Sequence, residues 1–184
     1  ERCQNWPSDS ASRDARFDDG GFCFILDDPV RNKAGEAGTD ARGRTRYRSY
    51  GSATADGLQA LNAYGLAADH PRVAAARQWL SDRFSAQSHP GDYPEARGHL
   101  REAVYYYYSA SVARAFTSLQ LQRHAPCDLP TNWLASLATE LLLRQNSDGA
   151  WSNPAVDTRE DDPLVATPLA MRALVACQQV LSQA

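Results

Sequence analysis

The sequence has no large excess of either charge and no apolar run that approaches the roughly 20 residues needed to cross a bilayer. Its 184 residues hold 19 Lys and Arg against 22 Asp and Glu, a net charge of −3. We therefore expect no broad basic surface that attracts nucleic acid or an anionic membrane, and no transmembrane segment. With 43% hydrophobic and 22% charged residues, the composition fits one globular domain spanning residues 1–184.

Cysteine is scarce, and no two cysteines form a CxxC pair. The four are Cys3, Cys23, Cys127 and Cys177. Such wide spacing argues against a zinc ribbon or a thioredoxin-type redox site. The even number allows two disulfides in three connectivities, and four reduced, buried thiols are equally compatible. Four cysteines and the lack of an initiator Met fit a secreted or periplasmic chain, the alternative being a cytoplasmic one.

Motifs for nucleotide, hydrolase and metal chemistry are also missing. The sequence contains no Gly-x-Gly-x-x-Gly, no phosphate-binding loop and no Gly-x-Ser-x-Gly elbow. His124 and Cys127 have a spacing that could bind a metal, but no second such pair lies near them in the sequence. We therefore predict neither a cofactor nor a metal.

The chain changes character near residue 50. Residues 1–50 indicate an irregular segment, because Pro7–Asp19 is rich in Ser, Asp and Arg and Lys33–Gly43 is rich in Gly, Ala and charge. Between them, the apolar run Phe22–Leu26 suits a buried strand or an extended segment. This part of the chain is expected to be irregular or to carry a short β-hairpin.

An alternating row of arginines lies at the end of the irregular segment. The row consists of Arg42, Arg44, Arg46 and Arg48. If the stretch is extended, all four guanidinium groups project from one face and could hold a phosphate or diphosphate. The alternative is a solvated loop edge in which the arginines pair with nearby carboxylates. Those carboxylates are Asp18, Asp19, Asp27 and Asp28.

Residues 51–184 carry apolar side chains at helical spacing, and five helices are predicted there. Their starts lie near Ser52, Pro71, His99, Thr131 and Pro163. The third helix should run from His99 to Gln122, and Pro168 should kink the last helix or mark its true first turn. Helices joined in pairs by loops indicate an all-α fold of stacked αα-hairpins.

The sharpest motif is RQNSDGAW at Arg144–Trp151. It places Gln at the end of a Leu-rich helix, followed by Gly, any residue and Trp. Gln145 can hydrogen-bond to loop backbone, Gly149 can take a positive φ, and Trp151 can stack and donate from its indole.

A degenerate copy, DDGGF, occurs at Asp18–Phe22. Here Phe22 replaces Trp two positions after Gly20, and no Gln stands at the matching distance. Cys3–Asn5 looks like the end of a helix that would precede this copy. Each copy is followed by a segment of the form Ser/Thr…Ala…Leu, at Tyr50–Leu58 and Asp162–Leu169 respectively.

These copies resemble the QW repeat of squalene–hopene and oxidosqualene cyclases, where Gln, Gly and Trp brace one helical hairpin against the next. The chain thus resembles the terpenoid cyclase/protein prenyltransferase superfamily, and more narrowly the bacterial prenyltransferase/squalene-oxidase-repeat proteins of undefined activity. The resemblance implies an α/α toroid with inner helices starting near Ser52, His99 and Pro163 and outer helices at Pro71 and Thr131. A complete toroid has more helices, so the resemblance also implies a missing N-terminal half or self-association.

Class II terpene cyclases protonate an alkene with the central acid of an Asp-x-Asp-Asp motif. The nearest match here is Arg159–Asp162, and its Asp161 and Asp162 are the candidate catalytic residues. Arg159 stands where the first Asp should be, and a guanidinium favours ionised carboxylates, the wrong state for a proton donor. The alternative is that Asp162 is an N-cap followed by Pro163 at the first helical position.

The resemblance implies an isoprenoid or other lipid ligand in a helix-lined cavity. Candidate ligand-binding residues are Tyr50, Thr54, Tyr106, Arg46 and Arg48. Within the YYYY run, helical phase puts Tyr105 and Tyr108 on the core stripe and Tyr107 on the polar side, with its hydroxyl in solvent. Tyr106 lies over a small-residue face that admits a close helix or borders a cavity. The alternative function is a structural or interaction module whose surface binds another protein or a second copy.

Overall fold

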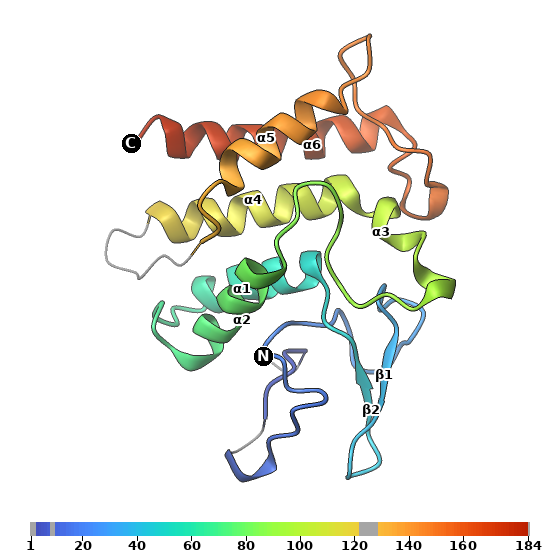
Figure 1. Ribbon diagram of the computed structural model, residues 1–184, viewed down its shortest axis with the longest axis vertical. Coiled ribbons are helices and arrows are strands. Elements are labelled where there is room, and N and C mark those ends of the chain that lie inside the picture. The colour runs from blue at the N-terminus through green and yellow to red at the C-terminus, as the bar shows by residue number, and fades with distance from the viewer. Residues whose placement is uncertain (1–2, 8–9, 122–128, 184) are drawn as a thin grey trace.

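The computed structural model describes residues 3–7, 10–121 and 129–183. Six α-helices make up most of it (Figure 1): α1 Gly51–Ala63, α2 Pro71–Arg83, α3 Leu100–Ala103, α4 Tyr105–Leu121, α5 Trp133–Leu143 and α6 Pro163–Leu181. Three 3-10 turns, Ser10–Ser12, Glu95–Arg97 and Val156–Thr158, lie in the connections. The mostly helical fold is as predicted, and His124 and Cys127 lie outside the described residues.

A short antiparallel hairpin of β1 (Glu36–Thr39) and β2 (Thr45–Tyr47) lies in the N-terminal segment. Its turn is held by the Asp40 carboxylate, which accepts from the backbone N–H groups of Arg42 and Arg44. The predicted β-hairpin is therefore present, within an otherwise irregular segment that lies below α1 and α2 in Figure 1.

The prediction of a buried strand over Phe22–Leu26 is wrong beyond its first residues. Phe22 is buried and pairs with Gln4 in an isolated antiparallel bridge, but Phe24 and Leu26 are about half exposed. After Cys23 the chain leaves the Gln4 segment, because the N–H of Phe24 donates to the Asn32 side chain and not to the backbone of a neighbouring strand.

The helix predicted over His99–Gln122 is interrupted at Val104, where φ and ψ of −125° and 28° leave the helical region. The short α3 ends there and α4 begins at Tyr105. At the other end of the chain, α6 starts at Pro163 and passes through Pro168 without interruption, so Pro168 does not mark its first turn.

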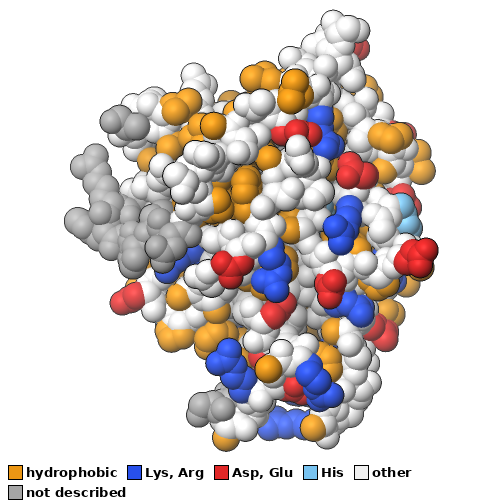
Figure 2. All heavy atoms as spheres, in the orientation of Figure 1, with side chains coloured by type: hydrophobic (Ala, Val, Ile, Leu, Met, Phe, Trp, Pro, Cys, Tyr) orange, Lys and Arg blue, Asp and Glu red, His pale blue; other side chains and the backbone are white. Residues whose placement is uncertain are grey.

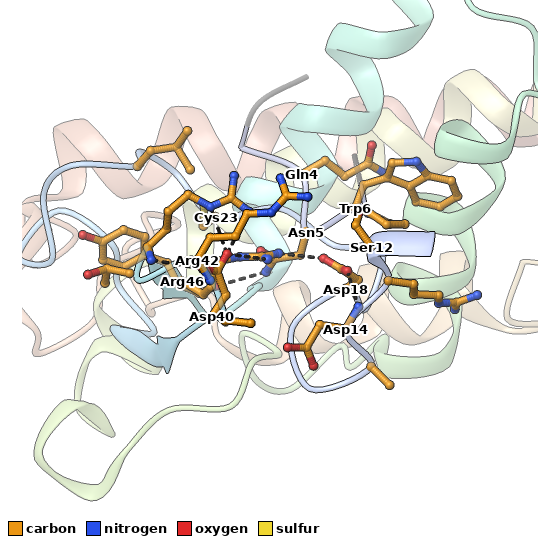
Figure 3. A pocket seen from close by; sticks show the side chains of 18 of the residues that line it. Gln4, Asn5, Trp6, Ser12, Asp14, Asp18, Cys23, Asp40, Arg42 and Arg46 are labelled. Carbon is orange, nitrogen blue, oxygen red and sulfur yellow. Dashed lines mark hydrogen bonds and ion pairs between the residues drawn. The ribbon is translucent and has the colours of Figure 1, made fainter. Parts of the chain in front are cut away.

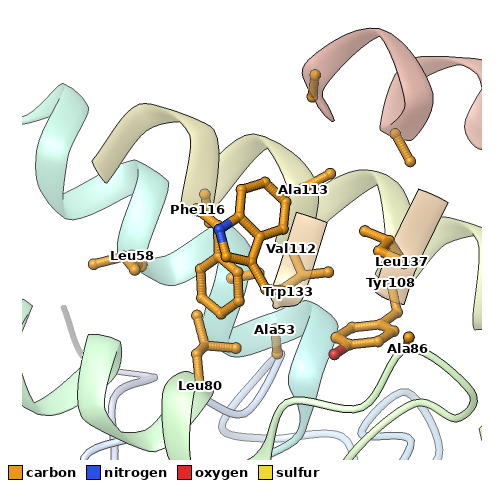
Figure 4. Packing of buried hydrophobic residues seen from close by; sticks show 14 of the residues in the cluster. Ala53, Leu58, Leu80, Ala86, Tyr108, Val112, Ala113, Phe116, Trp133 and Leu137 are labelled. Carbon is orange, nitrogen blue, oxygen red and sulfur yellow. The ribbon is translucent and has the colours of Figure 1, made fainter. Parts of the chain in front are cut away.

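The helices pack around one apolar cluster. α1 packs against both α2 and α4, and α4 packs against α6 and α5. In the cluster the Phe116 and Trp133 rings meet edge to face at 5.4 Å, with Leu58 to the left of them and Leu80 below them in Figure 4. Helix α4 is therefore the central element, with α1 on one side of it and α6 on the other.

Candidate functional site

The QW-like motif forms a hydrogen-bonded loop between α5 and α6. The Gln145 side-chain amide donates to the Gly149 carbonyl at 2.7 Å, and Gly149 has a φ of +85°. The buried Trp151 indole N–H donates to the Leu141 carbonyl in the last turn of α5, also at 2.7 Å. The motif thus ties the end of α5 to the loop that leads into α6.

The degenerate copy before α1 has the same backbone pattern. Gly20 donates to the Asn5 carbonyl at 2.9 Å and Asn5 donates to the Gly21 carbonyl at 2.8 Å. The corresponding bonds in the second copy, Gly149 to Asn146 and Asn146 to Ala150, have the same lengths. The two loops therefore close in the same way.

The Gln that the sequence pattern lacks is supplied by Gln4. Its side-chain amide donates to the Gly20 carbonyl at 3.0 Å, as Gln145 does to Gly149. Gln4 and Gly20 are 16 positions apart, whereas Gln145 and Gly149 are four apart, so the first copy contains a 12-residue insertion (16 − 4). The insertion hides the repeat from a search at fixed spacing.

Each copy is also anchored by a threonine on the helix that follows. The Phe22 N–H donates to Thr54 Oγ1 in α1 at 3.0 Å, and the Trp151 N–H donates to Thr167 Oγ1 in α6 at 3.0 Å. Thr54 and Thr167 are thus equivalent positions, and α1 and α6 are equivalent helices. This equivalence gives a register, Thr54 to Thr167, for comparing the two helices residue by residue.

The candidate residue Arg46 lines an open depression of about 1250 Å³ beside the hairpin (Figure 3). Its guanidinium is 2.7 Å from the buried Asp18 carboxylate and 3.7 Å from that of Asp40. Arg44 also pairs with Asp40, at 2.8 Å, and the Arg48 guanidinium donates to a backbone carbonyl of β1. Arg46 therefore pairs with carboxylates, which is the alternative that the sequence left open.

The candidate residues Tyr50 and Thr54 are both buried and form the start of α1. The first turn of α1 is capped by His89, a residue that the sequence gave no reason to select. His89 Nε2 accepts from the Ser52 N–H at 2.8 Å, and His89 Nδ1 lies 3.0 Å from the Tyr93 hydroxyl. Burial lowers the pKa of His89 to about 3, so the imidazole that caps α1 is neutral.

The pKa of His89 predicts a loss of stability in acid. The unfolded chain takes up a proton near pH 6.5, whereas the folded chain resists it until about pH 3. The free energy of unfolding should therefore fall by up to about 1.4 kcal/mol per pH unit between these values. His89→Gln should remove this dependence, as measured by urea unfolding from pH 7 to pH 4. If the free energy of unfolding of His89→Gln still falls between pH 7 and pH 4 as in the wild type, groups other than His89 cause the loss of stability.

The candidate acids Asp161 and Asp162 lie at the start of α6. Asp162 Oδ1 accepts from the Leu164 N–H at 2.9 Å, with Pro163 in the first turn, which is the capping role given above as the alternative. Asp161 is exposed. The buried acid of this motif is Glu160, which sequence reasoning missed.

Glu160 caps α4 from a distant part of the chain. Its carboxylate accepts from the N–H groups of Tyr106 and Tyr107 at 2.9 and 2.8 Å and from the Asn153 side chain at 2.9 Å. Burial raises the pKa of Glu160 to about 7, against the opposing effect of these donors. One signal was available in the sequence: no Ser, Thr, Asp or Asn precedes α4 at Ala103 or Val104, so its cap had to come from elsewhere.

The four tyrosines have separate environments. Tyr105 and Tyr108 are fully buried, as their helical phase predicted. Tyr106 is buried against the motif loop, where its hydroxyl donates to the Ser152 carbonyl at 3.2 Å, so its small-residue face admits a close neighbour. Tyr107 is partly exposed, and its hydroxyl donates to the Asp56 carboxylate of α1 at 2.7 Å.

An apolar stripe on α6 is exposed at four positions, of which three are buried on α1 and the fourth, equivalent to Asn62, is partly buried. Leu164 and Met171 are 84% and 53% exposed, and Pro168 and Val175 lie on the same face. In the register set by Thr54 and Thr167, Met171 corresponds to Leu58, which is fully buried between α1 and its neighbours. We call Leu164, Pro168, Met171 and Val175 the α6 stripe. Figure 2 shows apolar side chains at the surface in the upper part of the view, where α5 and α6 lie.

On another face of α1 and α6 the burial is reversed: residues that are buried on α6 have exposed equivalents on or next to α1. Ala173 and Cys177 of α6 are buried on the side that packs against α4. Their equivalents are Ala60 of α1 and Tyr64, which follows α1 as its C-cap, and both are exposed, Tyr64 at 80%. The two ends of the helix stack therefore show complementary open faces.

Helix α6 also has the length and composition of a membrane-crossing helix, and 33% of it is buried within the structure. Core helices satisfy the same test, and the buried face of α6 packs against α4. Among the described residues, no cluster of three or more His, Cys, Asp or Glu side chains is arranged to hold a metal ion. Comparison with protein-family models, curated proteins and solved structures found no match to this chain.

Proposed function

We propose that the chain is a helical-repeat module of the terpenoid cyclase/prenyltransferase toroid type, and that it acts by associating with a second copy of itself. The equivalent hydrogen-bonded loops before α1 and α6 support the repeat architecture. The observation that carries the proposed association is the α6 stripe, which is exposed at positions where α1 is mostly buried.

The α6 stripe has the wrong character for the end of a repeat stack. Terminal repeats that face solvent need a polar outer surface, because each repeat buries its apolar face only against a neighbour. Leu164, Met171 and Val175 are each at least half exposed. Each Å² of apolar surface that a partner removes from water contributes about 25 cal/mol of favourable free energy. Contact with a partner is therefore favoured over exposure to solvent.

A second copy fits this face because the repeat already contains the matching contact. Within one chain, the face of α1 that includes Leu58 is covered by neighbouring helices including α4, and α4 also covers the Ala173 and Cys177 face of α6. In a head-to-tail pair, the α6 stripe of one copy would meet the exposed Ala60 and Tyr64 face of α1 in the other. Such an interface is heterologous, since the two copies contribute different surfaces.

Catalysis is the weaker candidate function. Asp162 and Glu160 are both engaged as helix caps, and Tyr106 is packed against protein. A bound isoprenoid remains the prediction of the family resemblance. Native mass spectrometry of the purified chain tests it directly, because a lipid that survives stringent washing would add its mass to the protein.

The association is tested by sedimentation equilibrium on Val175→Glu, with Val30→Glu as the matched control. Both valines are exposed, at 50% and 75%, but Val30 lies in the N-terminal segment away from α6. The wild type and Val30→Glu should show masses that rise with concentration, whereas Val175→Glu should stay monomeric, because a charge on the α6 stripe is costly to bury without a partner.

Two results would contradict the proposal. One is a wild-type chain that remains monomeric up to several hundred micromolar. The other is a wild-type chain that binds lipid vesicles through Val175 without self-associating, which would make a membrane surface the occupant of the α6 stripe.

A further inference from the structure

We propose that Cys3 and Cys23 are a disulfide site, which closes a covalent loop around the insertion of the first repeat copy. Both thiols are free in the structure, and the two residues lie directly opposite each other on antiparallel segments. The proposal is independent of self-association, because neither cysteine lies on α1 or α6.

The backbone register places the two cysteines within bridging distance. Gln4 pairs with Phe22 in an isolated antiparallel bridge, and the same register brings Cys3 opposite Cys23 one position further out. The Cys23 N–H donates to the Cys3 carbonyl at 3.0 Å. Residues directly opposite each other on antiparallel segments have Cα atoms about 4.5–5.5 Å apart and side chains on the same face, and disulfides span about 4.4–6.8 Å between Cα atoms.

Each thiol already points toward the opposite segment. Cys23 Sγ lies 3.3 Å from the Cys3 carbonyl oxygen, and Cys3 Sγ lies 3.5 Å from that of Phe24. Bringing the two sulfur atoms into a bond therefore needs side-chain rotation and no exchange of backbone partners. The neighbouring hydrogen bonds of Gln4 to Gly20 and Arg72 hold the register during that rotation.

The two thiols differ in access, which sets the order of the chemistry. Cys3 is half-buried and Cys23 is buried. With oxidised glutathione as the oxidant, the Cys3 thiolate attacks one glutathione sulfur, forms a mixed disulfide and releases one glutathione thiolate. The Cys23 thiolate then attacks Cys3 Sγ and releases the second. The two thiols lose two electrons and two protons, and glutathione disulfide is reduced to two glutathione molecules.

The experiment is equilibration of the full chain with oxidised glutathione, followed by non-reducing peptide mapping. Trypsin should release Cys3–Arg13 joined to Phe17–Arg31, with a mass lower by two hydrogens than the sum of the reduced peptides. The cross-link should raise the melting temperature by about 5 to 10 °C, because it closes a loop of about 20 residues in the unfolded chain.

Matched variants separate this pair from the remaining thiols. Cys177→Ser should form the same linked peptides, whereas Cys23→Ser should give only a glutathione adduct on Cys3. The proposal is overturned if the wild type gives only adducts, or if Cys3 is found joined to Cys127 or Cys177. Either result leaves the self-association test on Val175 unaffected.

Discussion

Trp151→Ala is expected to lower the free energy of unfolding by about 3 to 5 kcal/mol, the range for truncation of a buried aromatic side chain. The indole is 4% exposed, and its N–H donates to the Leu141 carbonyl at the end of α5. Truncation would leave both a cavity and an unpaired carbonyl at the joint between α5 and α6. Urea unfolding followed by circular dichroism measures the effect.

Two further variants resolve this effect into its parts. Trp151→Phe keeps much of the apolar surface but loses the indole donor and part of the ring volume, so it should cost about 1 to 3 kcal/mol. Phe22→Ala makes the equivalent truncation in the first copy, where Phe22 packs against Gly57 of α1, and should cost about 3 to 5 kcal/mol. Losses below about 1 kcal/mol in both alanine variants would show that the two loops do not brace the helices.

Glu160→Ala is expected to lower the free energy of unfolding by about 2 to 4 kcal/mol, because it removes three hydrogen bonds from a buried site. The N–H groups of Tyr106 and Tyr107 would lose their acceptor at the start of α4, the central helix. Asp161→Asn is the matched control. Asp161 is exposed beside Glu160, so its substitution should change stability by less than about 0.5 kcal/mol.

The pH dependence of Glu160 opposes that of His89. The folded chain binds a proton at Glu160 below about pH 7, whereas the unfolded chain does so only near the ordinary value of 4.5. The stabilisation from this group is therefore complete below about pH 4.5 and is lost as the pH rises through 7. Glu160→Gln should abolish that slope, seen as a flatter melting temperature between pH 5 and 8. A slope unchanged by the substitution would contradict the raised pKa.

The start of a helix could be predicted from the sequence where the capping residue lies next to the first turn that it caps. Asp162 with Pro163, and His70 with Pro71, cap α6 and α2 through side chains that lie two positions from the N–H group they bind. Local geometry decides such contacts, so a short stretch of sequence contains all the information needed.

Caps supplied from distant residues could not be predicted in this way. Glu160 reaches Tyr106 across 54 positions, and His89 reaches Ser52 across 37. Only the packing of α4 against the α6 loop and of α1 against the loop after α2 brings these groups together. The break at Val104 follows from the first of these contacts, because α4 starts where Glu160 accepts its N–H groups.

The repeat itself was only partly visible in the sequence. The Gly turn and the aromatic residue of the first copy could be recognised, but Gln4 was separated from them by the insertion. In the arginine row the sequence pattern alone was misleading. The alternating spacing predicted that all four guanidinium groups project from one face of an extended segment. Arg46 instead turns to Asp18, 28 positions earlier, because a buried carboxylate requires a partner.

In the proposed association, copies of this chain pair head to tail, the α6 stripe of one against α1 of the next. The most direct test mixes Val175→Glu, which blocks the α6 stripe, with Tyr64→Glu, which blocks the face of α1. Each variant alone should be monomeric by sedimentation equilibrium, and an equimolar mixture should form a one-to-one heterodimer through the faces left intact. A mixture that remains monomeric, while the wild type associates, would contradict the head-to-tail arrangement.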